Sequence, residues 1–310
     1  MNRRFQSMAC IGECMLELRL SGTTTTAAEV SVSGDSLNTA IYTKRSASQD
    51  LRVAYATALG TDEVSERMIS VIQLENIDTA LVRRVGDKFP GCYAIVNDQS
   101  GERSFLYWRE QSAARQLFAD DSTAYMEALA QFDAWYLSGI SLAILDAEQR
   151  AFLFNAIKSF RDQGGLLIFD SNYRPNLWTS QDVAREVTAQ AWRLCDIALP
   201  SLDDEMALFG DADEQAVLDR LQTYGVAFGA LKRSALGPAP IGWTTEMCYP
   251  AAENVTDTTA AGDSFNGGFL AALAQGRSPQ DAAQAGHRLA SLVVTQRGAI
   301  IDPALMPDRP

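Results

Sequence analysis

Short runs of hydrophobic residues recur along the chain and alternate with longer stretches whose hydrophobic residues repeat every three to four positions. The short runs have the length of buried β-strands, and several end in glycine, serine or aspartate. They cover residues 8–11, 53–58, 92–96, 134–137, 166–169, 197–199 and 226–231. The amphipathic stretches, which predict helices, include residues 64–75, 147–163 and 215–224. Strands that alternate with helices predict an α/β fold whose parallel sheet is covered on both faces.

Two segments, residues 13–34 and 91–109, depart from this rhythm because their pattern repeats every second residue. Tyr93 and Ile95 alternate with their neighbours in this way. Such alternation, bounded by turn residues, predicts antiparallel ribbons. We expect the two ribbons to pair into one small sheet that projects as a lid. The sequence has no internal repeat or linker, so we expect one domain over residues 1–310 with the lid inserted in it.

The charge balance of the chain limits its partners. Acidic residues outnumber basic ones by 39 to 26, so the 310-residue chain has a formal net charge of −13. Nucleic acids and anionic membranes are bound through clustered basic side chains, so neither is an expected partner. A small anionic ligand stays possible, because a local pocket can oppose the sign of the whole chain.

The cysteine and histidine content excludes further kinds of site. Five cysteines without a C-x-x-C pair predict neither a disulfide framework nor a zinc knuckle, and the single histidine, His287, excludes a histidine-rich metal site. Glu13 interrupts the first apolar run, which is therefore too short for a signal peptide. No stretch reaches the ~18 apolar residues of a membrane span. We expect a soluble, cytoplasmic protein.

The stretch most indicative of chemistry is residues 254–270. From Asp263 onward hydrophobic residues recur at helical spacing, so residues 258–262 predict a loop of small side chains that opens onto a helix N-terminus. Such a terminus offers unpaired amides and the positive end of the helix dipole, which favour a phosphate. Asp263 is either a simple helix cap or, with a phosphate present, a carboxylate placed to accept a proton from an attacking hydroxyl.

Three motifs together resemble those of the ribokinase-like (PfkB) carbohydrate kinases. They are D-T-T-A-A-G-D-S-F-N-G-G-F-L at residues 257–270, S-G-D-S-L-N-T-A at residues 33–40 and Y-A-T-A-L-G-T-D-E-V at residues 55–64. The resemblance covers most of the chain, from residue 9 to about residue 302. It implies a three-layer α/β/α sandwich with a mostly parallel central sheet and a small β-sheet lid. It also implies transfer of the γ-phosphoryl group of ATP to a sugar hydroxyl, with Mg²⁺ bridging the phosphates.

The resemblance assigns roles to single residues. Asp263 is implied to be the general base that removes the hydroxyl proton. The amides implied to stabilise charge on the transferring group belong to Ala260, Ala261 and Gly262. The sugar hydroxyls are assigned to Gly34, Asp35 and Asn38, which from the residues alone could equally form a plain helix N-cap.

Three further segments narrow the substrate within the family. Residues 101–114, 136–145 and 169–178 resemble the members that phosphorylate 2-keto-3-deoxygluconate at its 6-hydroxyl. A sugar acid needs a cation for its carboxylate, and Arg109 and Arg174 in these segments suit that role.

Other readings of these segments stay open. A fructokinase or ribokinase of the same fold would make Arg109 and Arg174 dispensable for substrate choice. A related keto-deoxy acid, such as 2-keto-3-deoxygalactonate, differs by one hydroxyl that the sequence does not report. A sugar-acid sensor without activity is a third alternative, against which the intact Asp263 argues. Tyr93 and Tyr107 are either ordinary strand aromatics or part of a lid that closes over the sugar.

The resemblance also implies a nucleotide site. K-R-S-A-L-G at residues 232–237 is similar to the family's K-x-G-x-x-G turn and implies that Lys232 and Gly237 contact ATP. Asn172 is implied to lie near the phosphates, and His287 beside the adenine ring. In isolation, a histidine in such a helix is more often a surface or hydrogen-bonded side chain.

Metal ions and assembly are implied in the same way. S-L-D-D-E at residues 201–205 is similar to a motif linked to the magnesium water shell, which implies Asp204 with Glu205 adjacent. Asp257 corresponds to a monovalent-cation loop of some relatives, so K⁺ is a candidate cofactor. Relatives pair their lids between subunits, so we expect a homo-oligomer, a dimer or higher.

Overall fold

The computed structural model describes residues 4–20, 28–97, 103–120 and 122–307, and it confirms the expected α/β fold class. The larger sheet has the strand order β12-β11-β10-β9-β8-β1-β4-β5, and its neighbouring strands are parallel except β11 with β12. Its strands are β1 (Ser7–Ile11), β4 (Arg52–Leu59), β5 (Val82–Arg84), β8 (Ala134–Ser138), β9 (Leu166–Asp170), β10 (Ile197–Ala198), β11 (Gly229–Leu231) and β12 (Ala239–Ile241). The run at residues 226–231 was expected to be one strand, but only its second half pairs in the sheet.

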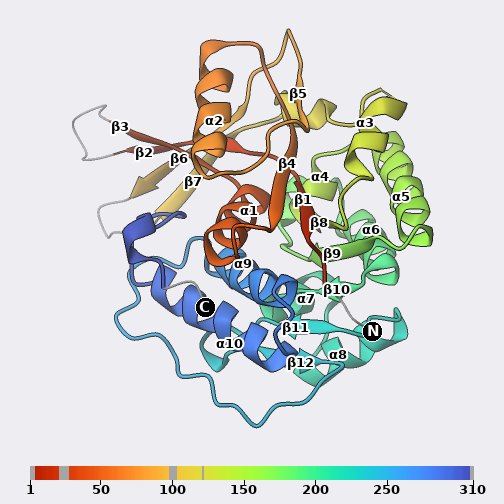
Figure 1. The fold of residues 1–310 in the computed structure, drawn as a ribbon, viewed down its shortest axis with the longest axis vertical. Coiled ribbons are helices and arrows are strands. Elements are labelled where there is room, and N and C mark those ends of the chain that lie inside the picture. The colour runs from red at the N-terminus through yellow and green to blue at the C-terminus, as the bar shows by residue number, and fades with distance from the viewer. Residues whose placement is uncertain (1–3, 21–27, 98–102, 121, 308–310) are drawn as a thin grey trace.

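Helices cover both faces of the larger sheet because its strands are hydrophobic on both sides. Along β1, Ala9 and Ile11 pack into one core, whereas Met8 and Cys10 pack into the other. The first core contains side chains of α3 (Thr123–Leu129), α4 (Gly139–Ala143), α5 (Ala147–Asp162), α6 (Gln181–Leu194), α7 (Leu202–Phe209) and α8 (Glu214–Thr223). The second contains side chains of α1 (Asp35–Ser46), α2 (Glu63–Leu74), α9 (Ala261–Ala274) and α10 (Pro279–Val293). Figure 1 shows the sheet between these two layers.

The three amphipathic stretches of the sequence are confirmed as α2, α5 and α8, each within one residue of the expected ends. The aspartate that precedes each of these helices explains where the helix begins. Asp62, Asp146 and Asp213 precede α2, α5 and α8, and each carboxylate accepts a hydrogen bond from an amide of the first turn. Such caps satisfy backbone donors that have no partner inside the helix.

The smaller sheet is built from the two expected ribbons. Its order is β3-β2-β6-β7, with β2 (Met15–Leu20), β3 (Ala28–Ser33), β6 (Gly91–Asn97) and β7 (Arg103–Trp108). Each ribbon is antiparallel, whereas β2 and β6 join the ribbons in parallel. The expected ribbons also include residues 21–27 and 98–102, which lie outside the described residues. The sheet projects from the main body at the left of Figure 1.

The two faces of the smaller sheet differ in chemistry, because successive side chains of a strand point to opposite faces. Glu17 and Tyr93 are register partners on one face, and both are buried. The other face is apolar and partly open to solvent, with the expected Leu16, Leu18 and Val30 joined by Leu106 and Trp108. Val30, Leu106 and Trp108 are each at least half exposed.

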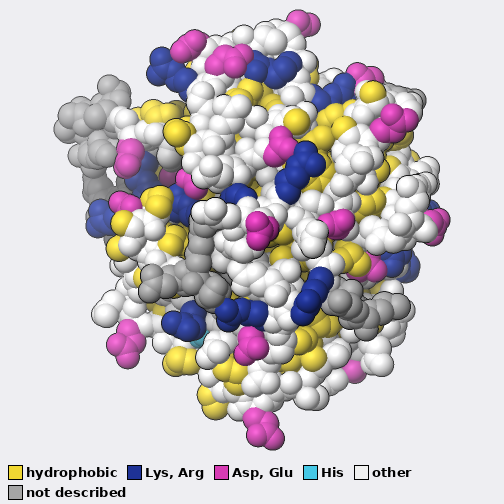
Figure 2. All heavy atoms as spheres, in the orientation of Figure 1, with side chains coloured by type: hydrophobic (Ala, Val, Ile, Leu, Met, Phe, Trp, Pro, Cys, Tyr) yellow, Lys and Arg dark blue, Asp and Glu magenta, His cyan; other side chains and the backbone are white. Residues whose placement is uncertain are grey.

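The surface and the thiols agree with the sequence. Figure 2 shows basic and acidic side chains interspersed on the face drawn, with no continuous basic patch there. All five cysteines are free thiols. Within the part of the chain that the structure describes, no helix combines the length and the hydrophobicity needed to cross a bilayer.

Candidate active site

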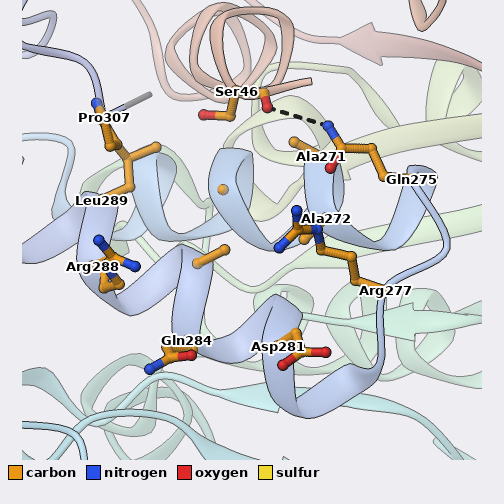
Figure 3. A pocket seen from close by; sticks show the side chains of 12 residues that line it. Ser46, Ala271, Ala272, Gln275, Arg277, Asp281, Gln284, Arg288, Leu289 and Pro307 are labelled. Carbon is orange, nitrogen blue, oxygen red and sulfur yellow. Dashed lines mark hydrogen bonds between the residues drawn. The ribbon is translucent and has the colours of Figure 1, made fainter. Parts of the chain in front are cut away.

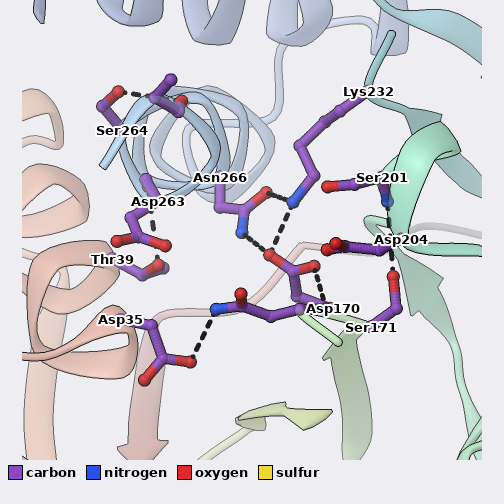
Figure 4. A network of polar contacts seen from close by, with 12 residues as sticks. Asp35, Thr39, Asp170, Ser171, Ser201, Asp204, Lys232, Asp263, Ser264 and Asn266 are labelled. Carbon is purple, nitrogen blue, oxygen red and sulfur yellow. Dashed lines mark hydrogen bonds and ion pairs between the residues drawn. The ribbon is translucent and has the colours of Figure 1, made fainter. Parts of the chain in front are cut away.

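A polar cluster lies where the parallel strands of the larger sheet end. In open α/β sheets this edge is the usual place for ligands. Asp170 is the last residue of β9, and Lys232 follows β11. Lys232 Nζ donates to Asp170 Oδ2 at 2.5 Å and to Asn266 Oδ1 at 3.2 Å, while Asn266 Nδ2 donates to the same Asp170 oxygen at 2.6 Å. Figure 4 shows α9 delivering Asn266 to this edge.

Two helix N-termini meet beside the cluster. Asp35 opens α1, and Asp263 lies in the first turn of α9. The helices pack closely at Gly267, where a methyl group would lie only 2.4 Å from Tyr42 Cβ. This close approach brings Asn38 Nδ2 to 2.8 Å from Asp263 Oδ2, to which it donates.

Asp263 is buried and Asp35 is partly buried, and the two carboxylates are close enough to affect each other. Burial raises the pKa of Asp263 to about 7, the nearby Asp35 adds to the rise, and the hydrogen bond from Asn38 opposes it. Burial likewise raises the pKa of Asp35, whose Oδ2 accepts from Asn172 Nδ2 at 3.0 Å. A carboxylate with a pKa near neutrality is suited to taking up and releasing a proton.

The loop before α9 presents backbone amides beside Asp263. Ala260 adopts a left-handed conformation, with φ of 60°, and its carbonyl accepts the first helical bond, from Ser264 N at 2.8 Å. The Ala261 amide donates to Thr258 O at 3.2 Å. The amides of Gly262 and Asp263 therefore precede the first intrahelical donor. Lys232 Nζ lies 3.5 Å from where a Cβ at Gly262 would stand, so cation and amides converge on a place suited to an anion.

An acidic and a basic side chain pair beneath the smaller sheet. Arg109 Nη2 donates to Glu13 Oε2, and both side chains are almost completely buried. Glu13 Oε1 and Arg109 Nε have no hydrogen-bond partner among the described residues. Gly91 leaves room for the pair, since a methyl group there would lie 2.6 Å from Glu13 Oε1. The pair thus leaves one acceptor and one donor without a partner among the described residues.

The tyrosines assigned to the sugar lie on the inner face of the smaller sheet. Tyr93 Oη donates to Glu17 Oε2, and the Tyr93 ring lies 5.6 Å from that of Tyr107. Tyr93 is buried, whereas Tyr107 is half exposed. Gly34 precedes α1 with φ of 157°, and a side chain there would strike the Glu13 carbonyl at 2.3 Å.

Arg174 and Asp204 lie together near the strand ends. Arg174 Nη1 donates to Tyr173 O at 2.8 Å and to Asp204 Oδ1 at 3.5 Å. Glu205 instead points to α8, where Glu205 Oε2 accepts from Arg220 at 2.8 Å. Burial raises the pKa of Glu205 to about 7, against the opposing charge of Arg220. Glu205 therefore joins α7 to α8.

The side chain of Tyr249 packs against both His287 and Gly237. His287 Nε2 is 2.8 Å from Pro250 O, and its ring stands edge-on to that of Tyr249, with ring centroids 5.3 Å apart. Tyr249 also packs on Gly237, where a methyl group would lie 2.3 Å from Tyr249 Cβ. Gly237 has φ of 72°, a conformation that favours glycine.

The residues fit a magnesium ion in the manner usual for phosphoryl transfer. Within the described ranges, no three Asp, Glu, Cys or His side chains form a metal cluster. Mg²⁺ is often held by one or two carboxylates, phosphates and water rather than by a protein cage. Burial raises the pKa of Asp204; Arg174 opposes the rise and the neighbouring Asp170 adds to it. Asp204 is partly buried and its ion pair with Arg174 is long, at 3.5 Å, so a bound cation would stabilise its ionised form. Asp170 is already paired with Lys232.

Asp257 offers a poorer fit to a monovalent cation. Its Oδ1 accepts from Thr259 N at 3.0 Å and from Thr259 Oγ1 at 2.6 Å, and its Oδ2 accepts from Gly298 N at 2.9 Å. Arg19 Nη1 stands 4.0 Å from the same Oδ2. Both carboxylate oxygens thus have donors, and a cationic side chain is already adjacent.

The sequence missed several residues of this site. Asp170, Asn266 and Glu13 were not singled out, although each had a signal. Asp170 is the charged residue that ends a buried strand, and Asn266 lies three positions after Asp263 on one helix face. Glu13 interrupts the apolar first strand region and was interpreted only as an obstacle to a signal peptide.

The hollow in Figure 3 is a separate feature. It lies between the end of α1, the second half of α9 and α10, with Arg277 and Arg288 at its rim. None of the candidate site residues lines it. The polar cluster at the strand ends is therefore the candidate active site.

Comparison with known proteins agrees with this geometry. Residues 6–305 match the model of the pfkB family of carbohydrate kinases. The 2-dehydro-3-deoxygluconokinase of Dickeya dadantii (strain 3937) is 44% identical over 309 residues, spanning 97% of this chain and 99% of the relative. The enzyme of that name from Haemophilus influenzae is 40% identical over 303 residues, spanning 96% of each chain.

A solved structure supports the same architecture. A fructokinase with bound ATP from Xylella fastidiosa superposes with a TM-score of 0.80, at 21% identity, over 97% of this chain and 95% of that one. At this identity the likeness concerns the fold. Since a family model and full-length relatives both span nearly the whole sequence, the chain belongs to the pfkB family of carbohydrate kinases.

Proposed function

We propose that the protein transfers the γ-phosphoryl group of ATP to the 6-hydroxyl of 2-keto-3-deoxygluconate, also called 2-dehydro-3-deoxygluconate. The observation that carries this proposal is the identity of 40–44% with enzymes named 2-dehydro-3-deoxygluconokinase, over nearly the full length of both chains. The products are ADP and 2-keto-3-deoxy-6-phosphogluconate.

Asp263 acts as the general base in this proposal. It accepts the proton of the 6-hydroxyl as the oxygen attacks the γ-phosphorus and the bond to the β-phosphate oxygen breaks. A pKa of about 7 supports the role, because the carboxylate is then partly ionised near neutrality and still basic enough to take a proton. The hydrogen bond from Asn38 fixes the orientation of the carboxylate.

The loop before α9 stabilises the transferring group. We assign this role to the backbone of Ala260, Ala261 and Gly262; the Ala261 amide already donates to Thr258 O, so the Gly262 amide is the better-placed donor. Lys232 adds a positive charge beside Gly262. These groups oppose the negative charge that spreads over the phosphoryl oxygens in the transition state.

Nucleotide and magnesium are assigned to the neighbouring strand ends. Asn172 and Lys232 would face the phosphates, and Gly237 and His287 the adenine, with Tyr249 between them. Asp204, next to Asp170, would hold the water shell of a bound Mg²⁺, which would supply positive charge to the phosphates. Glu205 contributes less to this shell, because its Oε2 is bonded to Arg220 and only Oε1 is without a partner among the described residues. Potassium at Asp257 is left out, given the fit described above.

The sugar acid lies under the smaller sheet in this proposal. The Nε of Arg109, buried without a partner among the described residues, supports a contact with the substrate carboxylate, and Glu13 Oε1 a contact with a hydroxyl. Arg174 is half exposed and held only loosely by Asp204, so it could turn to the same carboxylate. Gly34, Asp35 and Asn38 would meet the sugar hydroxyls, and Tyr93 and Tyr107 would cover the ring.

The smaller sheet acts as a lid that excludes water, which would otherwise hydrolyse ATP. Its apolar outer face, with Val30, Leu106 and Trp108 at least half exposed, supports pairing with the same face of a second copy. We therefore propose a homo-oligomer, at least a dimer, that works in the cytoplasm on a small sugar acid and ATP.

A substrate panel tests the proposed function. The purified chain is assayed with ATP and Mg²⁺ against 2-keto-3-deoxygluconate, 2-keto-3-deoxygalactonate, fructose and ribose. We expect kcat/KM for the first acid to exceed those of the neutral sugars at least a hundredfold, about what one charge-assisted carboxylate contact provides. A preference for fructose or ribose would assign a different sugar kinase, and a preference for the galactonate epimer a related acid kinase.

A further inference from the structure

Arg19 reaches from the smaller sheet to the loop that opens α9. It lies near the end of β2, on the same face as Glu17, and its Nη2 donates to Glu17 Oε1 at 3.0 Å. Its Nη1 stands 4.0 Å from Asp257 Oδ2. Nη2 is also 3.6 Å from where a Cβ at Gly298 would stand. The guanidinium therefore lies between the two carboxylates, beside the turn that follows α10.

Asp257 is the residue that holds this loop in place. Its carboxylate is fully buried and binds the amide and hydroxyl of Thr259 on one side and the amide of Gly298 on the other. The backbone amide of Asp257 also donates to Val294 O at 3.1 Å. Ala260, the left-handed residue that precedes α9, lies only three positions after Asp257, so the contacts of Asp257 hold the start of α9.

The other carboxylate that Arg19 contacts belongs to the sugar side of the site. Glu17 is buried and accepts a hydrogen bond from Tyr93, its register partner on β6. A continuous series of polar contacts thus runs from Tyr93 through Glu17 and Arg19 to Asp257. Residues proposed to cover the sugar are joined in this way to the loop proposed to stabilise the phosphoryl group.

Charge makes Arg19 the central member of this series. A buried carboxylate is stable only with a positive or hydrogen-bonding neighbour. Arg19 lies beside both Glu17 and Asp257, and its side chain is about three-quarters buried. Without this side chain, two buried carboxylates would lose a cation that contacts both.

We propose that Arg19 is a positioning residue that ties the lid to the loop before α9 and supplies the positive charge at Asp257 that a bound monovalent cation would otherwise supply. The inference rests on the proposed function for its meaning in catalysis. Closure of the lid over the sugar would then position the amides that receive the phosphoryl group. The chain should need no K⁺ as long as Arg19 is present.

The test compares Arg19→Gln with Arg67→Gln, which removes an exposed arginine that pairs with Glu63 on α2. The readouts are kcat, both KM values, and the melting temperature with a non-hydrolysable ATP analogue and Mg²⁺. Each is measured in KCl and in tetramethylammonium chloride at equal ionic strength. We expect the wild-type chain and Arg67→Gln to give the same values in both salts.

For Arg19→Gln we expect kcat to fall about fivefold or more in tetramethylammonium, the range of an ordinary coupling between sites, with the KM for ATP little changed. KCl should restore much of the loss and raise the melting temperature of this variant alone. Arg19→Lys, which keeps the charge, should stay indifferent to K⁺, and it serves as the test if Arg19→Gln does not fold.

Three results would overturn the inference: a wild-type chain that itself needs K⁺, an Arg19→Gln variant equal to wild type in both salts, or an Arg19→Lys variant that gains a need for K⁺. The measurement of the melting temperature requires no sugar acid. A wild-type chain that melts as expected but phosphorylates no keto-deoxy acid would therefore contradict the proposed substrate and leave the role of Arg19 standing.

Discussion

Asn38 donates a hydrogen bond of 2.8 Å to Asp263, joining the first turn of α1 to the first turn of α9 across 225 positions of sequence. The bond favours the ionised form of Asp263, against burial and the charge of Asp35, which both favour the protonated form. The balance leaves the pKa of Asp263 at about 7. The Asn38 amide is therefore one of the groups that set the strength of Asp263 as a base.

The decrease of kcat/KM at low pH should therefore follow the protonation of Asp263. We expect kcat/KM to fall as the pH decreases through about 7, because protonated Asp263 cannot accept the hydroxyl proton. Asn38→Ala should move this decrease to higher pH, since it removes the hydrogen bond that favours the charge. Asn155→Ala, at an exposed position of α5, is the control and should leave the decrease in place. A decrease at the same pH in all three proteins would remove Asp263 from the titration.

Asp263→Asn should separate catalysis from stability. We expect kcat to fall by about 10²–10⁴, the usual effect of losing a general base. Because the folded-state pKa lies above the unfolded value, ionisation of Asp263 opposes folding, and this cost grows as pH rises from about 4 to above 7.

Thermal unfolding at pH 5 and pH 8 tests the predicted effect of Asp263 on stability. The melting temperature of Asp263→Asn relative to wild type should be higher at pH 8 than at pH 5. Asp50→Asn, an exposed carboxylate, should show no such difference. An Asp263→Asn protein with near-native kcat would contradict the assignment of the base.

Arg109 and Arg174 should act on the sugar acid rather than on ATP. Arg174→Ala removes a half-exposed guanidinium and should raise the KM for 2-keto-3-deoxygluconate by one to two orders of magnitude, since a charge-assisted contact contributes about 1.5–3 kcal/mol. The KM for ATP should change little. Arg67→Ala is the surface control.

Arg109 needs a gentler change because its removal would leave Glu13 buried without its cation. Arg109→Lys keeps the charge but not the fork of donors that suits a carboxylate. We expect a raised KM for the acid at a melting temperature close to that of wild type. If both arginine variants raised the KM for ATP alone, the arginines would be nucleotide ligands.

The sequence predicted the parts of the site that are contiguous and missed those that folding assembles. Asp263 and its loop form one stretch that opens a helix, so local pattern and dipole chemistry indicated a place for an anion there, and the family resemblance implied the role of Asp263. Asp170 and Lys232 follow different strands, and their contact appears only when β9 and β11 end at one edge of the sheet. No local periodicity reports such a contact.

The sequence also did not predict which residue would pair with each buried charged side chain. Arg109 was singled out for its charge, but the sequence did not indicate that Glu13, 96 positions earlier, would bind it. Glu205 resembled a metal-shell residue by position, yet its orientation depends on Arg220 of the next helix. Residue type predicts that a buried charge will have a partner, whereas only the packing of elements decides which one.

Gly267 should be needed for the close approach of α9 to α1. Gly267→Ala would place a methyl group 2.4 Å from Tyr42 Cβ and 2.9 Å from the Thr43 backbone nitrogen, so α9 has to move away from α1. We expect a loss of about 1–3 kcal/mol in the free energy of unfolding, typical of overpacking, together with a lower kcat as Asn38 and Asp263 separate. Gly86→Ala, where a methyl group meets nothing within 4 Å, is the control for both readouts.

The apolar outer face of the smaller sheet should be covered by a second copy of the chain. A four-stranded sheet with one face on its own core and Val30, Leu106 and Trp108 open to water exposes a patch that soluble monomers rarely keep. We expect light scattering at micromolar concentration to give at least twice the mass of one chain. Leu106→Glu should shift the protein toward the monomer, because it places a charge in the apolar contact, whereas Leu74→Glu, on an exposed leucine at the end of α2, should not. A wild-type protein that is monomeric at this concentration would show that the patch has another use, and the lid would then have to close over the sugar acid within one chain.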